Sequence, residues 1–359
     1  MLHKDFYVWG AGLYGGRLIE FMKEDLTFKA VIDTDVSKCG SVFHGIPIVS
    51  YAGVERDLRT SIIVIAINLP TEVRSFLLKE GYIENENFFV IHDFVSWYYW
   101  NKKKALVTKT IDIACTTKCN MRCMACQTFI PFSENPIHMS QDRVIGDVDL
   151  IFKYIDCTIN FNFAIGENLL NDELPEICYK IREQYVGRYR FLSVQTNGTI
   201  VPKDDAMLRF SQAEVVLGIA NYPENVETTK KLVEKCDKYN VSWYYNRAGG
   251  NREYWFNYGD PGIIKDTDSV RLREQYKKCW KPGVGYCDKH LYLCEAQAWS
   301  HLVAKTGTLE PGEAFDLRQP KTEASRSELY RLLMKQTKNG YISHCMRCNS
   351  VMTSYLPKL

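Results

Sequence analysis

Residues 110–126, TIDIACTTKCNMRCMAC, carry the most informative pattern in the sequence. A short apolar run is followed there by three cysteines with C-x3-C-x2-C spacing: Cys119, Cys123 and Cys126. Thiolates are the ordinary ligands of iron–sulfur clusters, and three of them can hold three irons of a 4Fe–4S cube while the fourth iron stays open. A closed structural zinc site needs a fourth ligand. The spacing therefore predicts a cluster with one open position.

Zinc is an alternative for this loop, because Cys115 could complete a zinc knuckle with the three cysteines. The chain has 13 Cys among 359 residues, which is well below the density of a disulfide scaffold. Its first residues, Met1–Asp5, do not resemble a signal peptide. Clustered cysteines in such a chain indicate metal binding in a reducing cytoplasm.

Composition narrows the class of protein. The length of 359 residues suits two or three domains, and 46% hydrophobic with 25% charged residues is ordinary for a globular chain. A net charge of +2 gives no general attraction to nucleic acid or to anionic membranes. No apolar run approaches the length of a transmembrane helix.

The first hundred residues predict a strand–turn–helix unit. Residues 6–9 form an apolar run, residues 18–22 continue as a helix, and residues 29–32 form a second strand that ends at Asp33. Between the first strand and the helix lie three glycines with G-x-G-x-x-G spacing: Gly10, Gly12 and Gly15. Such glycines let the backbone approach a phosphate, and an acid near the position of Asp33 can bind ribose.

The stretches 31–35 and 40–49 resemble the small Rossmann-like domains attached to capsule and glycan enzymes. That resemblance implies a domain over residues 1–104 that binds a nucleotide, a nucleotide-sugar or nothing; NAD is a further candidate. The unit is short for a full dinucleotide fold. A purely structural role therefore stands beside nucleotide binding.

The three-cysteine spacing, with Asn120 and Arg122 inside it and a strand-like run before it, resembles radical S-adenosylmethionine (radical SAM) enzymes. The resemblance implies that the open iron binds S-adenosylmethionine. Reductive cleavage, with electrons from a donor such as flavodoxin or ferredoxin, then gives a 5′-deoxyadenosyl radical that abstracts a substrate hydrogen. It also implies a partial (β/α)6 barrel. The alternating strand-like and helix-like stretches of residues 105–275 favour such an α/β fold rich in parallel strands.

Two further segments resemble this family. Residues 164–171 are similar to its G-G-E-P-L-L segment, which implies that Gly166 and Glu167 contact the methionine amino group, although Ile165 and Asn168 replace a glycine and the proline. Residues 191–199 are similar to its strand ending in T-N-G. That segment offers three polar candidates for S-adenosylmethionine: Ser193, Gln195 and Asn197. A helix-entry glutamate and a simple strand-to-turn signal are the alternatives.

Residues 215–222 predict another barrel strand, followed by a helix over residues 227–239. Residues at the carboxyl ends of barrel strands face the reaction. Asn221 and Tyr222 are therefore predicted to lie on the substrate side.

The last part of the chain, residues 276–359, contains a second group of cysteines that resembles the SPASM and twitch extensions of radical SAM enzymes. Four of them could close one auxiliary 4Fe–4S cluster: Cys279, Cys294, Cys345 and Cys348. A structural zinc ribbon is the alternative. Cys287 is left over, as a packing cysteine, an alternative ligand or a thiol that returns hydrogen to a substrate radical. Four other cysteines are predicted to be buried core residues: Cys39, Cys157, Cys178 and Cys236.

Three functions follow from these patterns. The first is a radical SAM enzyme that oxidises or epimerises a carbohydrate, either a nucleotide-activated or a lipid-linked sugar, since the N-terminal resemblance is to glycan enzymes. The second is a radical SAM enzyme that modifies peptides, as many SPASM proteins do. The third is a zinc-binding scaffold without catalytic activity.

Overall fold

The computed structural model describes residues 4–67, 70–245, 255–279, 283–307, 309–349 and 351–353. They form an α/β fold with two sheets of mainly parallel strands, which confirms the predicted fold class. The chain divides into two compact units, Met1–Lys109 and Thr110–Leu359. Among the described residues, no helix combines the length and the apolar character needed to cross a bilayer.

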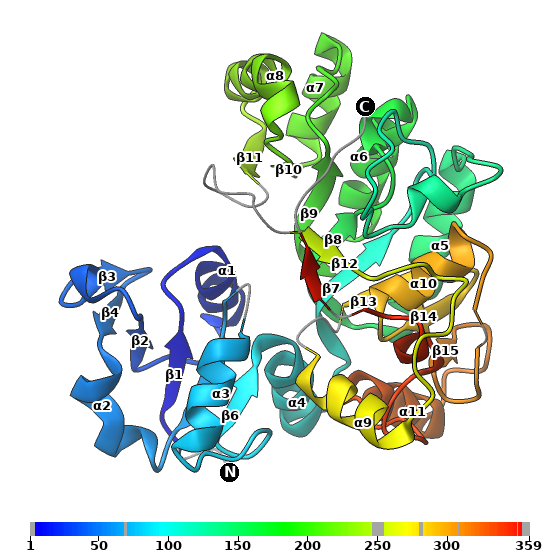
Figure 1. The fold of residues 1–359 in the computed structure, drawn as a ribbon. Coiled ribbons are helices and arrows are strands. Elements are labelled where there is room, and N and C mark those ends of the chain that lie inside the picture. Colours follow the sequence, from blue (N-terminus) through cyan, green and yellow to red (C-terminus); the bar gives the residue numbers. More distant parts are fainter. Residues whose placement is uncertain are drawn as a thin grey trace. The chain divides into compact units, whose positions relative to one another are not determined.

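The N-terminal unit is built on one sheet with the strand order β3-β4-β2-β1-β5-β6, in which only the β3–β4 pair is antiparallel (Figure 1). Its strands are β1 (Phe6–Trp9), β2 (Ala30–Ile32), β3 (Val42–Phe43), β4 (Ile46–Val49), β5 (Ile62–Ile65) and β6 (Phe88–Val90). Its helices are α1 (Leu13–Met22), α2 (Tyr51–Leu58), α3 (Thr71–Lys79) and α4 (Ile91–Lys103).

Continuous apolar runs explain the central strands, since parallel strands are covered on both faces. Every residue of β1 and β5 is buried. The turn between β1 and α1 requires glycine at two positions. Gly10 has φ +123°, and a Cβ on Gly15 would lie 2.0 Å from the Gly10 carbonyl oxygen.

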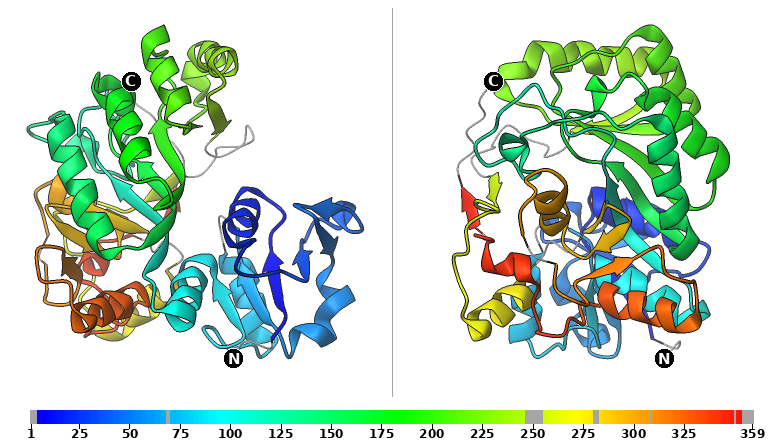
Figure 2. Two further views of the ribbon diagram at one scale, coloured as in Figure 1. Left: turned by 180° about the vertical axis from the view of Figure 1, so that it is seen from behind. Right: turned by 90° about the vertical axis from the view of Figure 1, so that its right-hand side faces the viewer.

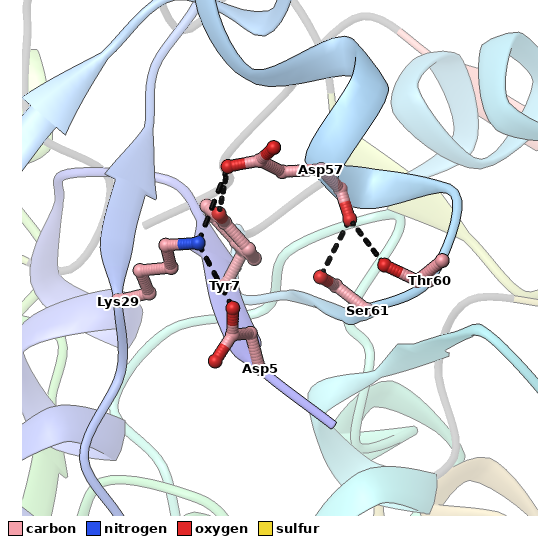
Figure 3. Close-up of polar contacts among 6 residues, drawn as sticks. All are labelled: Asp5, Tyr7, Lys29, Asp57, Thr60 and Ser61. Atoms are coloured by element: carbon pink, nitrogen blue, oxygen red, sulfur yellow. Dashed lines mark hydrogen bonds and ion pairs between the residues drawn. The ribbon is translucent and has the colours of Figure 1, made fainter. Parts of the chain in front are cut away.

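A polar cluster fastens one end of this sheet (Figure 3). Lys29 Nζ donates to Asp5 Oδ2 at 2.9 Å and to Asp57 Oδ2 at 3.2 Å, and the Tyr7 hydroxyl donates to Asp57 Oδ2 at 3.3 Å. Ser61 Oγ donates to the backbone oxygen of Asp57 at 2.7 Å. These contacts join β1, β2 and the end of α2. Because the ion pairs are exposed, each stabilises the fold only modestly.

The second unit contains an eight-stranded sheet with the order β11-β10-β9-β8-β7-β13-β14-β15 (Figure 1). Its strands are β7 (Val107–Ile113), β8 (Cys157–Phe163), β9 (Tyr189–Thr196), β10 (Val215–Ile219), β11 (Ser242–Tyr245), β13 (Val284–Cys287), β14 (His290–Tyr292) and β15 (Ala314–Asp316). β12 (Trp255–Asn257) and β16 (Val351–Thr353) form a separate antiparallel pair. The helices are α5 (Gln141–Tyr154), α6 (Leu174–Gln184), α7 (Asp204–Gln212), α8 (Val226–Tyr239), α9 (Ser269–Lys278), α10 (Glu295–Leu302) and α11 (Glu323–Leu333).

The two faces of the large sheet differ in character. One face is apolar and lies against the green helices that follow β7 to β10 (Figure 2): the rings of Phe161 and Phe152 of α5 are 5.2 Å apart. The opposite face is polar, because Asp112, Asn162 and Ser193 share it by strand register. The sequence of β8, alternating Asn and Phe, thus separates a packing face from a face available to ligands.

The segment from residue 276 onward joins this same sheet. β13 is parallel to β7, with Gly285 opposite Asp112, whereas β14 and β15 are antiparallel additions. A Cβ on Gly285 would lie 2.7 Å from Ala298 Cβ, so α10 packs closely on this strand. The predicted domain boundary at residue 276 therefore lies inside the second compact unit, Thr110–Leu359.

Candidate active site

The three-cysteine loop leaves the carboxyl end of β7 and leads to α5. Cys119, Cys123 and Cys126 are all partly buried. Burial raises the pKa of Cys119 to about 11, with smaller contributions from Glu167 and Cys126. Burial, followed by the charges of Cys126 and Cys119, raises the pKa of Cys123 to about 12. The three thiols are therefore close neighbours.

This set of donors fits an iron–sulfur cluster. Thiols that oppose one another's ionisation become thiolates together when bound iron supplies positive charge. Among the described residues, no group of three or more His, Cys, Asp or Glu side chains is arranged to hold a metal ion. A cluster does not require that arrangement, because each thiolate binds a different iron.

Asn197 connects the T-N-G turn to the cysteine loop. Its Nδ2 donates to Asn120 Oδ1 at 2.9 Å and lies 3.8 Å from Cys119 Sγ. Asn120 Nδ2 in turn donates to Thr199 Oγ1 at 2.8 Å. Two segments that are more than seventy residues apart in the sequence thus meet beside the first cysteine.

Glu167 is fully buried and connects the same elements. Its carboxylate accepts from Leu169 N at 3.0 Å, Thr196 Oγ1 at 2.9 Å and Asn197 N at 2.6 Å. Burial raises its pKa to about 7, while these three hydrogen bonds lower it. Its own N–H donates to the Lys118 backbone oxygen at 2.8 Å, next to the first cysteine.

Gly166 is required for this approach. It has φ +64°, and a Cβ there would lie 2.4 Å from the Lys118 backbone oxygen. Any larger residue would push the segment away from the cysteine loop.

Asn168, which stands where the related motif has proline, makes contacts that proline cannot make. Its Nδ2 donates to the backbone oxygens of Phe163 at 3.0 Å and Gln195 at 2.8 Å. Its Oδ1 accepts from Cys115 Sγ at 3.2 Å, and Cys115 is fully buried. The thiol of Cys115 also contributes to the raised pKa of Cys178, so Cys115 lies in the core, and its contacts do not favour a role as fourth zinc ligand.

The polar face of the sheet presents Ser193 and Gln195 next to each other on β9. Ser193 Oγ is buried without a hydrogen-bond partner among the described residues. Gln195 Nε2 donates to the Tyr244 hydroxyl at 3.1 Å. Its amide lies over Gly218, where a Cβ would be 2.3 Å from Gln195 Oε1. Gly218 therefore leaves the space that this amide occupies.

β10 ends at Ile219, so Asn221 and Tyr222 follow the strand that was predicted to include them. Tyr222 is buried and Asn221 is half-buried. The connection they belong to lies near the cysteine loop, because the charge of Glu224 helps to raise the pKa of Cys123. Asn225 Nδ2 also donates to the Asn197 backbone oxygen at 3.1 Å.

Cys287 is buried at the end of β13, and burial raises its pKa. Its charged neighbours are Asp288, Lys305 and Arg143. By the two-residue period of a strand, its side chain shares the face of Gly285 that α10 covers. The side chain of Cys287 therefore lies on the face of β13 against which α10 packs.

The distal cysteines come together. Burial, and then the charges of Cys279, Cys345 and Cys348, raise the pKa of Cys294. Burial also raises the pKa of Cys345, with contributions from Cys279 and Cys348. Four thiols from three segments are therefore neighbours, and their number and softness fit a 4Fe–4S cluster or zinc.

In the N-terminal unit, Asp33 lies beside the glycine turn. Its Oδ2 accepts from Ala11 N at 2.8 Å and from Lys38 Nζ at 3.2 Å, and its Oδ1 accepts from Asp35 N at 2.9 Å. Gly12 precedes α1 with open space around its Cβ position. The predicted ribose-binding acid therefore already binds the turn that it was expected to face.

Some features differ from the sequence expectation. Cys178 and Cys236 are buried as predicted, but Cys39 and Cys157 are partly exposed, since Cys39 follows a 3-10 turn and Cys157 is the first residue of β8. The pair formed by Asn162 Nδ2 and Asp112 Oδ1, 2.9 Å apart, was not singled out. The alternation of Asp112 with Ile111 and Ile113 is the signal that marks it.

Comparison with models of known protein families finds no match, and no curated protein matches. Among solved structures, similarity is found to "BtrN in complex with AdoMet and 2-DOIA" (14% identity, 68% of this chain and 93% of that chain, TM-score 0.39). A second is a histidine-tagged form of anSMEcpe with bound AdoMet (13% identity, 66% and 83%, TM-score 0.39). A third is "Native anSMEcpe with bound AdoMet and Cp18Cys peptide" (18% identity, TM-score 0.31), with 38% of this chain covering 42% of that chain. TM-scores this low do not establish a common fold.

Proposed function

We propose that this chain is a radical SAM enzyme. The observation that carries the proposal is the meeting of three sequence segments at the ends of β7, β8 and β9. Asn197 contacts both Asn120 and Cys119. Glu167 accepts a hydrogen bond from the backbone N–H of Asn197, and its own backbone N–H donates to the Lys118 oxygen. The same three segments carry the resemblance to the radical SAM family. Independent folding constraints thus support what the motifs suggest.

In this proposal, Cys119, Cys123 and Cys126 hold a 4Fe–4S cluster. When bound, the cluster supplies the electron that cleaves S-adenosylmethionine to a 5′-deoxyadenosyl radical, which abstracts a substrate hydrogen. Ser193 and Gln195 are the polar groups on the ligand-accessible face of β9. The buried Ser193 hydroxyl favours a ligand there, because a buried polar group without a partner is costly.

In this proposal, Glu167 has a structural role in addition to any contact with the ammonium group of methionine. Both of its oxygens accept hydrogen bonds from the chain, so its first effect is to fix the Asn197 turn against the cysteine loop. Its carboxylate retains acceptor capacity beyond these three bonds, so contact with an ammonium is compatible with them. Gly166 provides the backbone conformation that this position needs.

For the substrate, we propose a carbohydrate, in the form of a nucleotide-activated or lipid-linked sugar, because the N-terminal unit resembles domains of glycan enzymes. Oxidation suits the four distal thiols, since an auxiliary cluster could accept the electron that the substrate radical releases. Epimerisation would need a hydrogen donor such as Cys287, and the packing of β13 against α10 does not favour that role. Peptide modification is the second candidate, supported only by the resemblance of the distal cysteines to SPASM proteins.

For the N-terminal unit, the contacts of Asp33 favour a structural role over binding of NAD or another nucleotide. Titration of the full chain with NAD and with a uridine diphosphate sugar tests this. Saturable binding of either compound that is lost in Asp33→Asn would overturn the structural role.

The main test is anaerobic purification with analysis of iron, sulfide and zinc, followed by reduction in the presence of S-adenosylmethionine. We expect iron with matching sulfide, and formation of 5′-deoxyadenosine. Zinc alone, without cleavage of S-adenosylmethionine, would refute the enzyme and leave a metal-binding scaffold. Transfer of deuterium from labelled candidate sugars into 5′-deoxyadenosine would then identify the substrate.

A further inference from the structure

Arg347, between the two last cysteines, is a buried cation with unused donors. The residue is 8% exposed, and neither Nε nor Nη1 has a hydrogen-bond partner among the described residues. A charge removed from water without a partner is strongly unfavourable, so buried charges are normally paired or bind a ligand. These two unpartnered nitrogens therefore point to a missing acceptor.

Two histidines share the surroundings of this guanidinium. A 3-10 turn over Ser343–Met346 places His344 three residues before Arg347, with Arg347 N donating to the His344 backbone oxygen at 2.9 Å. Side chains three residues apart lie above one another on such a turn. Arg347 and His301 are the charged neighbours of His344, and Arg347 is also a charged neighbour of His301. The three basic side chains therefore lie together.

The imidazoles also have unused nitrogens. The Nε2 atoms of His344 and His301 are buried without hydrogen-bond partners among the described residues. The two rings are held in place by aromatic contacts. The ring of His344 lies 6.0 Å from that of Phe129, and the ring of His301 lies 5.5 Å from that of Tyr292.

The nearby buried acid is already engaged. Glu313 is 4% exposed and accepts from Gln297 Nε2 at 2.8 Å and from the backbone N and Oγ of Ser343 at 2.6 Å each. No ion pair of Arg347 occurs within the described part of the chain. The acceptor that Arg347 lacks is therefore not this carboxylate.

The position of the group relates it to the proposed chemistry. Phe129, which contacts His344, lies three residues after Cys126, at the end of the three-cysteine loop. Arg347 itself lies between Cys345 and Cys348 in the sequence. A ligand held by these basic groups would thus lie where the elements of both cysteine sites come together.

We propose that Arg347, His344 and His301 bind an oxyanion, the carboxylate or phosphate group of the substrate. The assignment to the substrate rests on the proposed function; the oxyanion site itself does not. A guanidinium presents parallel N–H groups that match two oxygens of one carboxylate or phosphate, and it keeps its charge at every physiological pH. The imidazole Nε2 atoms add two positions for N–H donors.

The test uses the full, iron-loaded chain with inorganic phosphate and acetate as probes, and binding is followed by 31P line width and by thermal stabilisation. We expect saturable binding of at least one probe, weakened roughly tenfold or more in Arg347→Gln and less in Arg347→Lys. Arg271→Gln is the matched control, because Arg271 is exposed and pairs with Asp266. Equal binding by the wild type and Arg347→Gln, or no saturable binding of either probe, would overturn the proposal.

Arg347→Gln could also disturb the neighbouring cysteines, so iron content is measured in each variant. His301→Gln provides the second readout, since His301 lies in the last turn of α10, at the opposite end of this helix from Cys294. Weakened binding in that variant supports the site, and unchanged binding contradicts it. Formation of 5′-deoxyadenosine without substrate tests the proposed function separately. If the wild type forms 5′-deoxyadenosine but binds neither probe, only the oxyanion site is refuted. If it binds a probe but forms no 5′-deoxyadenosine, only the proposed function is refuted.

If both probes bind, a substrate-borne group is distinguished from free phosphate by competition. A phosphorylated or carboxylated substrate should displace inorganic phosphate, and its deuterium transfer to 5′-deoxyadenosine should fall in Arg347→Gln through a higher KM. Displacement without this KM effect would contradict the assignment of the site to the substrate.

Discussion

Cys123 is the residue whose removal tests the three-cysteine loop most directly. In Cys123→Ala, the loop keeps two of its three neighbouring thiols, so we expect loss of its iron and of 5′-deoxyadenosine formation. The iron held by the four distal thiols should remain. Iron per chain and 5′-deoxyadenosine after reduction are the measurements. Cys157→Ala is the control, since the Cys157 thiol lies 3.7 Å from the Gly187 backbone oxygen. Unchanged cleavage in Cys123→Ala would refute the loop assignment.

Glu167 gives a prediction about pH. Its pKa rises from the ordinary 4.5 to about 7 in the folded state, so the folded chain binds this proton more tightly than the unfolded chain does. Its contribution to the free energy of unfolding is therefore complete below pH 4.5 and is lost as the pH rises through 7. The loss is on the order of 3 kcal/mol, at about 1.4 kcal/mol per pH unit.

Urea denaturation of the wild type and Glu167→Gln across this pH range checks the prediction. Glu167→Gln should lack this part of the pH dependence. It should also be less stable by ~1–3 kcal/mol, because an amide N–H₂ would face groups that donate hydrogen bonds. Identical pH dependence in both proteins would show that Glu167 does not titrate as its burial implies.

At the scale of elements, the pairing of β9, β10 and β11 determines how Gln195 is presented. Gly218→Ala places a methyl group 2.3 Å from Gln195 Oε1 and should displace this flexible amide, breaking its bond to Tyr244. Since the obstacle is the end of a side chain, the fold should tolerate the change. We expect little change in melting temperature but about tenfold weaker binding of S-adenosylmethionine, measured by equilibrium dialysis. Gly146→Ala, which meets no atom within 4 Å, is the control.

If Gly218→Ala binds S-adenosylmethionine like the wild type, Gln195 does not contact it. Tyr244→Phe is an independent test, since it removes the acceptor of the Gln195 amide and leaves Gly218 in place. Weaker binding in this variant would show that Tyr244 positions the amide.

The sequence predicted helices and strands where the apolar pattern was strong. The apolar run at residues 6–9 is β1, and the expected helix at residues 227–239 is α8, which begins one residue earlier. The hydrogen bonds of the Asn168 side chain could not be predicted from the sequence. They depend on where the backbone oxygens of β8 and β9 lie in the folded sheet. The strands β13 to β15 were also missed, since their three- and four-residue runs carry too little periodicity.

For the whole molecule, the order of the motifs along the chain predicts that residues 119–126, 166–167 and 197 form one site, and hydrogen bonds of Glu167 and Asn197 bring these segments together. The group of basic side chains formed by Arg347, His344 and His301 could not be predicted from the sequence. Its unused donors become visible only when burial and partners are known, because an isolated arginine in a sequence is by default a solvated surface residue.

The four distal thiols give the last prediction, which concerns how the two metal sites depend on each other. Because Cys279, Cys294, Cys345 and Cys348 form their own group of neighbours, Cys294→Ala should remove the metal of that group and leave the three-cysteine loop loaded. We expect iron per chain to fall by roughly half and 5′-deoxyadenosine to form still, while turnover of the substrate is lost. Cys39→Ala, in the N-terminal unit, is the control. Loss of zinc instead of iron would make the distal group a structural zinc site, and unchanged metal content would show that these thiols bind none.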